Sequence, residues 1–172
     1  IVGFGRIGKK LIKKCLGFEM EVYVYDPFVD KKIIESHGGK KINDLDSGLK
    51  EADILSLSVP LNKDTHNMIN FEKMKLMKKT SVIINISRGG VVNEKDLNEA
   101  LNNEIIYGAG LDVFEKEPPS NDNPLLKNKK VLLSPHAATF TKECLSSMAI
   151  QTAQNIIDFF DNKLNESMIV KL

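Results

Sequence analysis

The sequence has few of the residues that build disulfide-linked or metal-bound folds. Its 172 residues include no tryptophan, 6% aromatic residues and only two cysteines, Cys15 and Cys144. Two isolated cysteines form neither a disulfide framework nor the paired spacing of a zinc site. We therefore expect reduced thiols, a cytoplasmic location and no metal centre.

An excess of either charge and long hydrophobic runs are also lacking. The formal net charge is +1, which creates no field that would attract nucleic acid or an anionic membrane. No apolar run approaches the roughly 20 residues that span a bilayer, and no secretory signal is recognisable. We expect neither nucleic acid nor membrane as a partner. The length and the 42% of hydrophobic residues suit one globular domain.

Strand-like and helix-like patterns alternate along the chain, which predicts an α/β fold with a doubly wound parallel sheet. The continuous apolar run over 81–87 is typical of a strand that is buried on both faces. In such sheets, ligands bind at the carboxyl ends of the strands. Strands are expected over 21–26, 53–60, 81–87, 107–113 and 131–134, and helices over 7–17, 30–37, 93–101 and 145–160.

The segment "GFGRIG" has the glycine spacing of a dinucleotide-binding turn. Gly3 would permit a tight turn, Gly5 would let the backbone approach a pyrophosphate, and Gly8 would let the helix pack closely on the sheet. The amides of Arg6 and Ile7 would then lie at a helix N-terminus, where anions are favoured. The pattern alone is weakly specific.

Asp26 supports this interpretation, because it ends the next strand 18 residues after Gly8. A carboxylate there accepts hydrogen bonds from the adenosine ribose and repels a 2′-phosphate, which favours NAD over NADP. Lys31 and Lys32 are close enough in sequence to leave NADP open. The other interpretation of Asp26-Pro27 is a simple strand-ending turn.

Two further predicted strands end in charged residues. Arg88 follows the buried strand in "NISRGG", and a guanidinium there suits a carboxylate ligand. Asp112, Glu115 and Glu117 follow a strand of small residues in "GAGLDVFEKEPP". Asp112 could accept a hydrogen bond from the nicotinamide carboxamide. A surface arginine and solvated acids are the alternatives.

His136 lies between a predicted strand and the last helix, whereas His37 and His66 lie in polar surroundings. If Arg88, Glu117 and His136 converge beside a nicotinamide, Arg88 would hold a substrate carboxylate and His136 would exchange a proton with the neighbouring oxygen. Glu117 would orient the imidazole and raise its pKa. A structural histidine is the alternative.

Five motifs, "GFGRIG", "DILSLSVPLNKDTHNMI", "VIINISRGGVV", "GAGLDVFEKEPP" and "SPHAA", occur in an order and spacing that resembles the NAD-binding domain of the D-isomer-specific 2-hydroxyacid dehydrogenases. The resemblance covers nearly the whole chain and implies a Rossmann-type fold and NAD as cofactor. It implies Arg88, Glu117 (rather than Glu115) and His136 as catalytic residues. The implied cofactor-binding residues are Gly5, Arg6, Ile7, Asp26, Val59, Pro60, Ile86, Ser87, Asp112 and Ala138.

The resemblance also implies parts that this chain largely lacks. Family members carry a second domain that contacts the substrate, so we expect an NAD-binding domain over 1–164 and a tail over 165–172 that returns to that second domain. Ile1 would lie inside the first, central strand, and the chain alone would fold marginally and have little activity. A homodimer through this domain is expected. Ser134 stands where the family often has threonine.

The leading hypothesis is an oxidoreductase domain for a small 2-hydroxy or 2-keto acid. The principal alternative is a non-catalytic NAD-sensing scaffold or a co-repressor-like binding module. A formate dehydrogenase is disfavoured, because that group has glutamine where Glu117 stands. A methyltransferase that uses S-adenosylmethionine would not need Arg88, Glu117 and His136.

Overall fold

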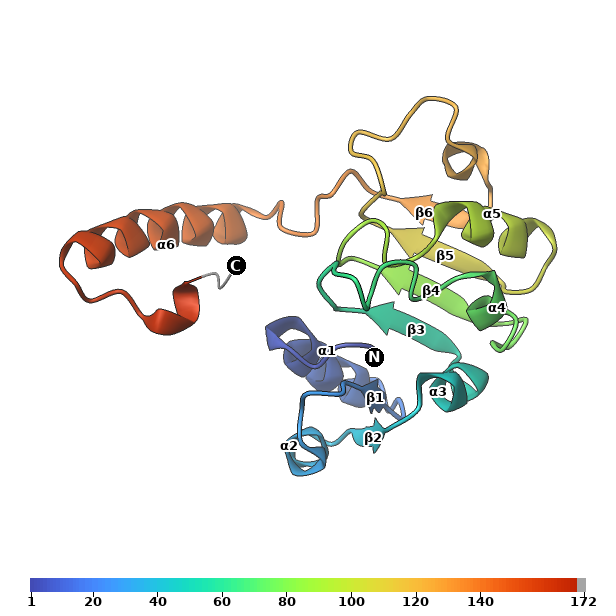
Figure 1. The fold of residues 1–172 in the computed structure, drawn as a ribbon, viewed down its shortest axis with the longest axis horizontal. Coiled ribbons are helices and arrows are strands. Elements are labelled where there is room, and N and C mark those ends of the chain that lie inside the picture. The colour runs from blue at the N-terminus through green and yellow to red at the C-terminus, as the bar shows by residue number, and fades with distance from the viewer. Residues whose placement is uncertain (170–172) are drawn as a thin grey trace. The chain divides into compact units, whose positions relative to one another are not determined.

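A computed structural model of the chain describes residues 1–169 (Figure 1). The chain divides into two compact units, Ile1–His136 and Ala137–Leu172, and each is described by itself below. Residues 170–172, at the end of the tail expected over 165–172, lie outside the described residues.

The first unit is built on parallel strands. β1 pairs with β2, and β3, β4, β5 and β6 pair in that order. Val2 bridges Tyr25 on one side and Leu57 on the other, so the first residues of the chain lie between β1 and β3. The parallel sheet predicted from the sequence is confirmed. The strands are β1 (Tyr23–Tyr25), β2 (Lys40–Ile42), β3 (Ile54–Leu57), β4 (Val82–Asn85), β5 (Gly108–Leu111) and β6 (Val131–Leu133).

Helices cover both faces of this sheet. On one face, Leu49, Met74 and Leu97 are fully buried and share a core with Leu57 and Ile83. Each such side chain stabilises the fold by roughly 1.5–3 kcal/mol. The helices on this face are α3 (Leu45–Glu51), α4 (Phe71–Met74) and α5 (Glu94–Asn102), and a 3₁₀ helix, η1 (Pro124–Lys127), follows β5.

The opposite face is covered by α1 (Arg6–Gly17) and α2 (Lys31–Ser36). Ile12 and Ile34 are fully buried against Val24 of β1. Val82 and Ile84 of β4 are only partly buried, so the prediction of a strand buried on both faces is wrong. Within the first unit, α1 and α2 pack over β1 rather than over β4.

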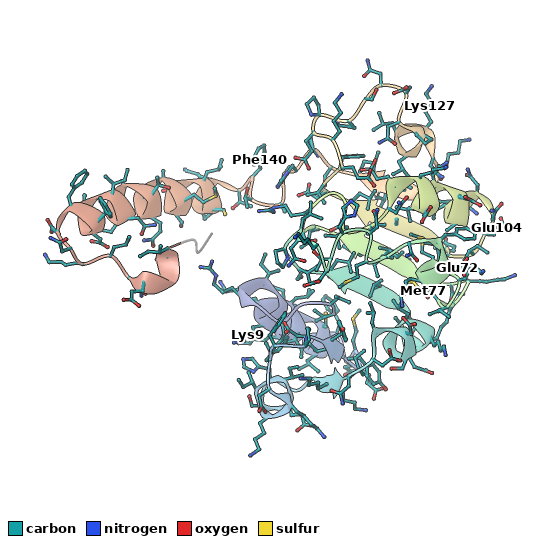
Figure 2. All side chains as sticks on the ribbon, viewed as in Figure 1. Lys9, Glu72, Met77, Glu104, Lys127 and Phe140 are labelled. Carbon is teal, nitrogen blue, oxygen red and sulfur yellow. The ribbon has the colours of Figure 1, made fainter. Side chains whose placement is uncertain are left out.

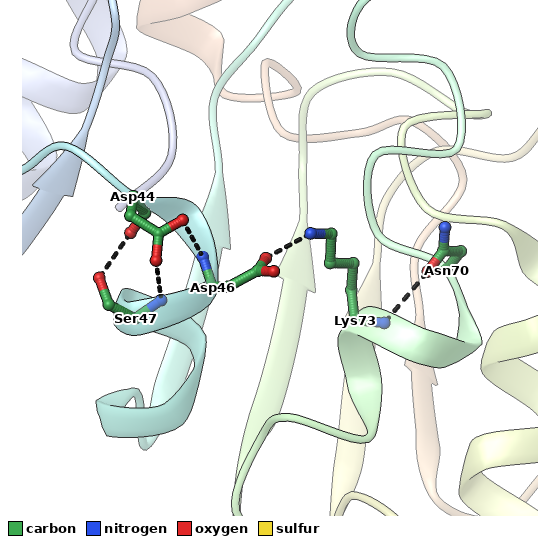
Figure 3. Close-up of polar contacts among 5 residues, drawn as sticks. All are labelled: Asp44, Asp46, Ser47, Asn70 and Lys73. Atoms are coloured by element: carbon green, nitrogen blue, oxygen red, sulfur yellow. Dashed lines mark hydrogen bonds and ion pairs between the residues drawn. The ribbon is translucent and has the colours of Figure 1, made fainter.

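Side-chain caps fix the starts of α3 and α4 (Figure 3). Asp44 accepts hydrogen bonds from the backbone amides of Asp46 and Ser47, and Asn70 accepts one from the amide of Lys73. Lys73 also forms an ion pair with Asp46, which joins the two helices. Since both charged groups are about one-third exposed, this pair contributes at most about 1 kcal/mol.

The second unit contains α6 (Lys142–Phe160) and a 3₁₀ helix, η2 (Glu166–Met168). Thr141 caps α6 by accepting a hydrogen bond from the amide of Cys144. In the part of the chain that the structure describes, no residue of α6 is buried. Across residues 1–169, no helix is long and apolar enough to cross a membrane.

Candidate functional site

The predicted site residues of the first unit follow the carboxyl ends of its strands. Asp26 follows β1, Arg88 follows β4, and His136 follows β6. Because the strands are parallel, these ends share one edge of the sheet. Met77 and Glu104, which precede β4 and β5, lie at the opposite edge (Figure 2).

The glycine turn packs too closely for side chains at two of its three glycines. Gly3 has φ +93, and a Cβ there would lie 2.5 Å from the carbonyl oxygen of Ser58. A Cβ at Gly8 would lie 2.3 Å from the carbonyl oxygen of Gly3. A Cβ at Gly5 would meet no atom within 4 Å. The turn is therefore closed at Gly3 and Gly8 and open at Gly5, as a turn that admits a pyrophosphate requires.

Helix α1 starts from this turn with an uncapped N-terminus. Gly5 is the N-cap residue, and no side chain among residues 1–169 caps the helix. The first intrahelical hydrogen bond runs from the amide of Lys9 to the carbonyl oxygen of Gly5. The amides of Arg6 and Ile7 therefore lack an intrahelical acceptor. A helix N-terminus of this kind favours an anion, so the turn fits a dinucleotide.

Asp26 is tied directly to the glycine turn. Its Oδ2 accepts a hydrogen bond from the amide of Phe4 at 2.8 Å, and its Oδ1 accepts one from the amide of Phe28 at 2.9 Å. A carboxylate has about four acceptor positions, so two positions remain for ribose hydroxyls. The bond from Phe4 could not be read from the sequence.

Two of the predicted site residues, Val59 and Pro60, follow β3. Val59 lies beside Gly3, since its Cγ1 would be 2.9 Å from a Cβ at that glycine. Pro60 accepts a hydrogen bond from the hydroxyl of Thr65 at 2.6 Å, which folds the following loop back on itself. The Oγ of Ser58 is buried without a hydrogen-bond partner in the described part of the chain. Sequence reasoning missed Ser58, a polar group beside the cofactor turn.

The loop that carries Arg88 is held by Asn85, the buried last residue of β4. The Nδ2 of Asn85 donates to the carbonyl oxygen of Arg88 at 3.0 Å, and its Oδ1 accepts from the amide and hydroxyl of Ser87. Ser87 is buried and Ile86 is exposed. Arg88 is exposed and donates from Nη1 to the carbonyl oxygen of Ser87 at 2.7 Å. The sequence contained Asn85 in its motif but gave no sign of this role.

Glu117 and His136 form a direct pair. The Oε2 of Glu117 lies 2.7 Å from the Nδ1 of His136, and its Oε1 accepts from the amide of Phe114 at 3.1 Å. The hydrogen bond from His136, followed by the one from Phe114, holds the pKa of Glu117 below its ordinary value of 4.5, and the charge of Arg88 acts in the same direction. Of the three residues expected to converge, Glu117 and His136 are therefore in direct contact.

The backbone of His136 has φ +51, in the left-handed region that residues other than glycine rarely adopt. Such a conformation costs of order 1–3 kcal/mol, persists only where the surroundings hold it, and is frequent at active sites. The hydrogen bond between the Nδ1 of His136 and the Oε2 of Glu117 is one contact that helps to hold this backbone conformation.

Asp112, Glu115 and Ala138 are three further residues considered in the sequence analysis. Asp112 is buried at the end of β5 and accepts a hydrogen bond from the hydroxyl of Ser134. Glu115 contacts the start of α5, where its Oε1 accepts a hydrogen bond from the amide of Glu94. Ala138 belongs to the second unit and is not placed relative to this site. Within residues 1–169, no cluster of three or more His, Cys, Asp or Glu residues could hold a metal ion.

Comparison with known proteins gives consistent matches. Residues 1–138 match the family described as "D-isomer specific 2-hydroxyacid dehydrogenase, NAD binding domain". The chain is 41% identical over 169 residues to the glyoxylate reductase of Korarchaeum cryptofilum, covering 98% of this chain and 51% of that protein. It is 38% identical over 169 residues to the D-3-phosphoglycerate dehydrogenase of Methanocaldococcus jannaschii, covering 98% and 32%.

A solved structure is also similar. The D-lactate dehydrogenase of Aquifex aeolicus, complexed with NAD and lactic acid, matches with a TM-score of 0.84 and 34% identity, over 94% of this chain and 53% of that chain. The chain thus spans about half the length, or less, of the proteins it matches.

Proposed function

The chain belongs to the family of D-isomer specific 2-hydroxyacid dehydrogenases, through their NAD binding domain, and from this we propose that it transfers hydride between NAD(H) and a small 2-hydroxy or 2-keto acid. The observation that carries the proposal is the contact of 2.7 Å between the Oε2 of Glu117 and the Nδ1 of His136. The positive charge of Arg88 also contributes to lowering the pKa of Glu117. A cofactor turn without this pair would support binding alone.

NAD is the cofactor of this domain family, and it supplies the hydride chemistry when bound. In our proposal, Gly5, Arg6 and Ile7 would hold the pyrophosphate at the open turn and helix N-terminus. Asp26 would accept hydrogen bonds from the adenosine ribose and disfavour a 2′-phosphate. From the family resemblance we also propose cofactor contacts for Val59, Pro60, Ile86, Ser87, Asp112 and Ala138.

Arg88 and His136 would act on the substrate. The guanidinium of Arg88 would bind the carboxylate, and its planar fork suits two parallel hydrogen bonds. The Nδ1 of His136 is directed at Glu117, which leaves Nε2 as the atom that exchanges a proton with the substrate oxygen. Glu117 would fix the orientation of the imidazole ring through its hydrogen bond with Nδ1.

The relatives support a substrate class rather than one compound. Their names refer to glyoxylate, 3-phosphoglycerate and lactate. These compounds all carry a carboxylate next to the reacting carbon. Arg88 and His136 would recognise this shared part, so we propose a 2-hydroxy or 2-keto acid without naming which.

We further propose the organisation and setting of the protein. Residues 1–164 would form the NAD-binding domain and residues 165–172 a tail toward a substrate domain, because the chain spans about half of a typical relative.

A homodimer through this domain is proposed from the family resemblance. A cytoplasmic location is proposed because Cys15 and Cys144 are both unpaired. The nearly neutral net charge supports a partner other than nucleic acid or membrane.

Oxidation of NADH by the full-length protein, measured against a panel of 2-keto acids, tests the proposal. We expect turnover with at least one compound of the panel. His136→Ala should reduce turnover by about 10²–10⁴-fold, the usual contribution of a general acid–base group, and should leave NADH affinity within about twofold. NADH binding without turnover on any member of the panel would instead support the NAD-sensing module.

A further inference from the structure

Two carboxylates link the loop before Glu117 to the start of α5. The amide of Glu94 donates to the Oε1 of Glu115 at 3.0 Å, and the amide of Glu115 donates to the Oε1 of Glu94 at 2.5 Å. The Nδ2 of Asn123 donates to the other oxygen of Glu94 at 2.7 Å. We call the reciprocal pair of bonds between Glu94 and Glu115 the glutamate clasp.

The helix end makes this arrangement favourable. Asn93 is the N-cap residue of α5 and Glu94 is its first residue. The amide of Glu94 is therefore one of the four amides that a helix leaves without an intrahelical acceptor. The carboxylate of Glu115 accepts this amide and interacts favourably with the positive end of the helix dipole.

The same loop touches the arginine loop on its other side. A Cβ at Gly89 would lie 1.7 Å from the carbonyl oxygen of Phe114 and 2.5 Å from the amide nitrogen of Glu115. The backbone after Arg88 thus lies directly against the peptide bond between Phe114 and Glu115. This peptide is fixed on one side by the clasp and on the other by Gly89.

The fixed segment also holds Glu117. The amide of Phe114 donates to the Oε1 of Glu117 at 3.1 Å, and the Oε2 of Glu117 bonds to His136. Because both oxygens belong to one rigid planar group, a donor that holds one oxygen restricts the directions in which the other can point. The direction in which Glu117 meets His136 therefore depends on where the backbone of Phe114 lies.

We propose that Glu115 and Glu94 are positioning residues for the acid–base pair: their clasp fixes the backbone at Phe114, and this backbone aims the carboxylate of Glu117 at His136. The inference rests on the proposed function, in which Glu117 and His136 act together. Glu115 lies in the same sequence motif as Glu117. In this inference Glu115 positions the acid–base pair and takes no part in the chemistry itself.

Loss of the clasp has a specific physical consequence. The groups that act on Glu117 are His136, the amide of Phe114 and the charge of Arg88, and together they hold its pKa below 4.5. Without the clasp the loop gains freedom, and the bonds from Phe114 and His136 are made for less of the time. The pKa of Glu117 should then rise toward its ordinary value.

The experiment compares Glu115→Ala and Glu94→Ala with wild type in the full-length protein. We expect kcat with the 2-keto acid to fall about tenfold, because only part of the 10²–10⁴-fold contribution of the acid–base group is lost. KM for NADH should stay within about twofold. Carboxyl NMR should show the pKa of Glu117 moving upward in both variants.

Two variants serve as controls. Glu115→Gln keeps an oxygen that accepts the amide of Glu94, so it should restore most of kcat and the low pKa of Glu117. Glu99→Ala removes an exposed carboxylate from the same helix and should behave as wild type. Urea unfolding of each variant separates the loss of positioning from a loss of folded protein.

The outcomes distinguish this inference from the proposed function. An active wild type whose kcat and Glu117 titration are unchanged in Glu115→Ala and Glu94→Ala would overturn the inference alone. Equal losses in Glu115→Gln and Glu115→Ala would also overturn it, because charge rather than the clasp geometry would then matter. A wild type inactive on every 2-keto acid would contradict the proposed function, whereas the titration of Glu117 would still test the clasp.

Discussion

Alanine substitutions at Gly5 and Gly8 should separate cofactor binding from folding. The two glycines lie in the same turn, but a Cβ at Gly5 meets no atom within 4 Å, whereas a Cβ at Gly8 would lie 2.3 Å from the carbonyl oxygen of Gly3. Gly5→Ala should therefore weaken NADH binding in a stable protein. Gly8→Ala should destabilise the protein itself.

The expected magnitudes follow from these contacts. A carbon normally lies about 3.3–3.6 Å from a carbonyl oxygen, so Gly8→Ala requires a shift of about 1 Å in the backbone. Such overpacking costs about 1–3 kcal/mol of unfolding free energy. At Gly5, the weaker N-cap preference of alanine costs about 0.5–1 kcal/mol. The lower entropy of the unfolded chain offsets this by about 0.4–1 kcal/mol. The net change at Gly5 should stay below about 1 kcal/mol.

Urea unfolding and NADH titration of the full-length protein provide the assay. For Gly5→Ala we expect NADH affinity to fall at least about tenfold, equivalent to about 1.4 kcal/mol, because the methyl group occupies the open space of the turn. Gly17→Ala, at the far end of α1 and also in open space, should leave affinity unchanged. Wild-type affinity in Gly5→Ala, or wild-type stability in Gly8→Ala, would refute this account of the turn.

Three further predictions concern single side chains. Asp26→Ala should reduce the preference for NADH over NADPH, because the carboxylate that repels a 2′-phosphate is removed; an unchanged ratio of the two KM values would contradict this. Arg88→Lys should raise KM for the 2-keto acid at least about tenfold although the charge is kept, since the bidentate fork is lost; near-normal KM would exclude bidentate binding. Because the pKa of Glu117 is lowered in the folded protein, its ionised form contributes stability above pH 4.5 that is lost as pH falls through the lowered pKa. The difference in unfolding free energy between wild type and Glu117→Gln should therefore shrink at acidic pH, and a difference that grows there would contradict the sign.

The sequence contained enough to predict the architecture, because its strongest patterns are local. The apolar run of β4 and the helical spacing in α1 appear within single windows of residues. α3 and α4 were not predicted, although Asp44 and Asn70 are typical N-cap residues, because these helices are short and each buries few side chains. β2 was also missed, since its three residues carry two lysines and gain their strand structure from pairing with β1.

For the site, the sequence indicated which residues to consider but not how they are held. The order of motifs pointed to Glu117 and His136, and the structure places them in contact. The restraints on them depend on tertiary contacts between distant segments. Asn85 needs the turn at Ser87 to fold back, and Glu115 needs the N-terminus of α5 beside it. Such contacts leave no periodic pattern in the sequence.

Hydride transfer is tested most directly by the rate at which the full-length protein oxidises NADH with a 2-keto acid, compared with the rate for NADH that carries deuterium at the transferred position. We expect wild type to oxidise NADH with a primary isotope effect when hydride transfer limits the rate. Arg88→Ala and His136→Ala should both bind NADH but fail to oxidise it. Wild-type rates in those two variants would contradict this expectation.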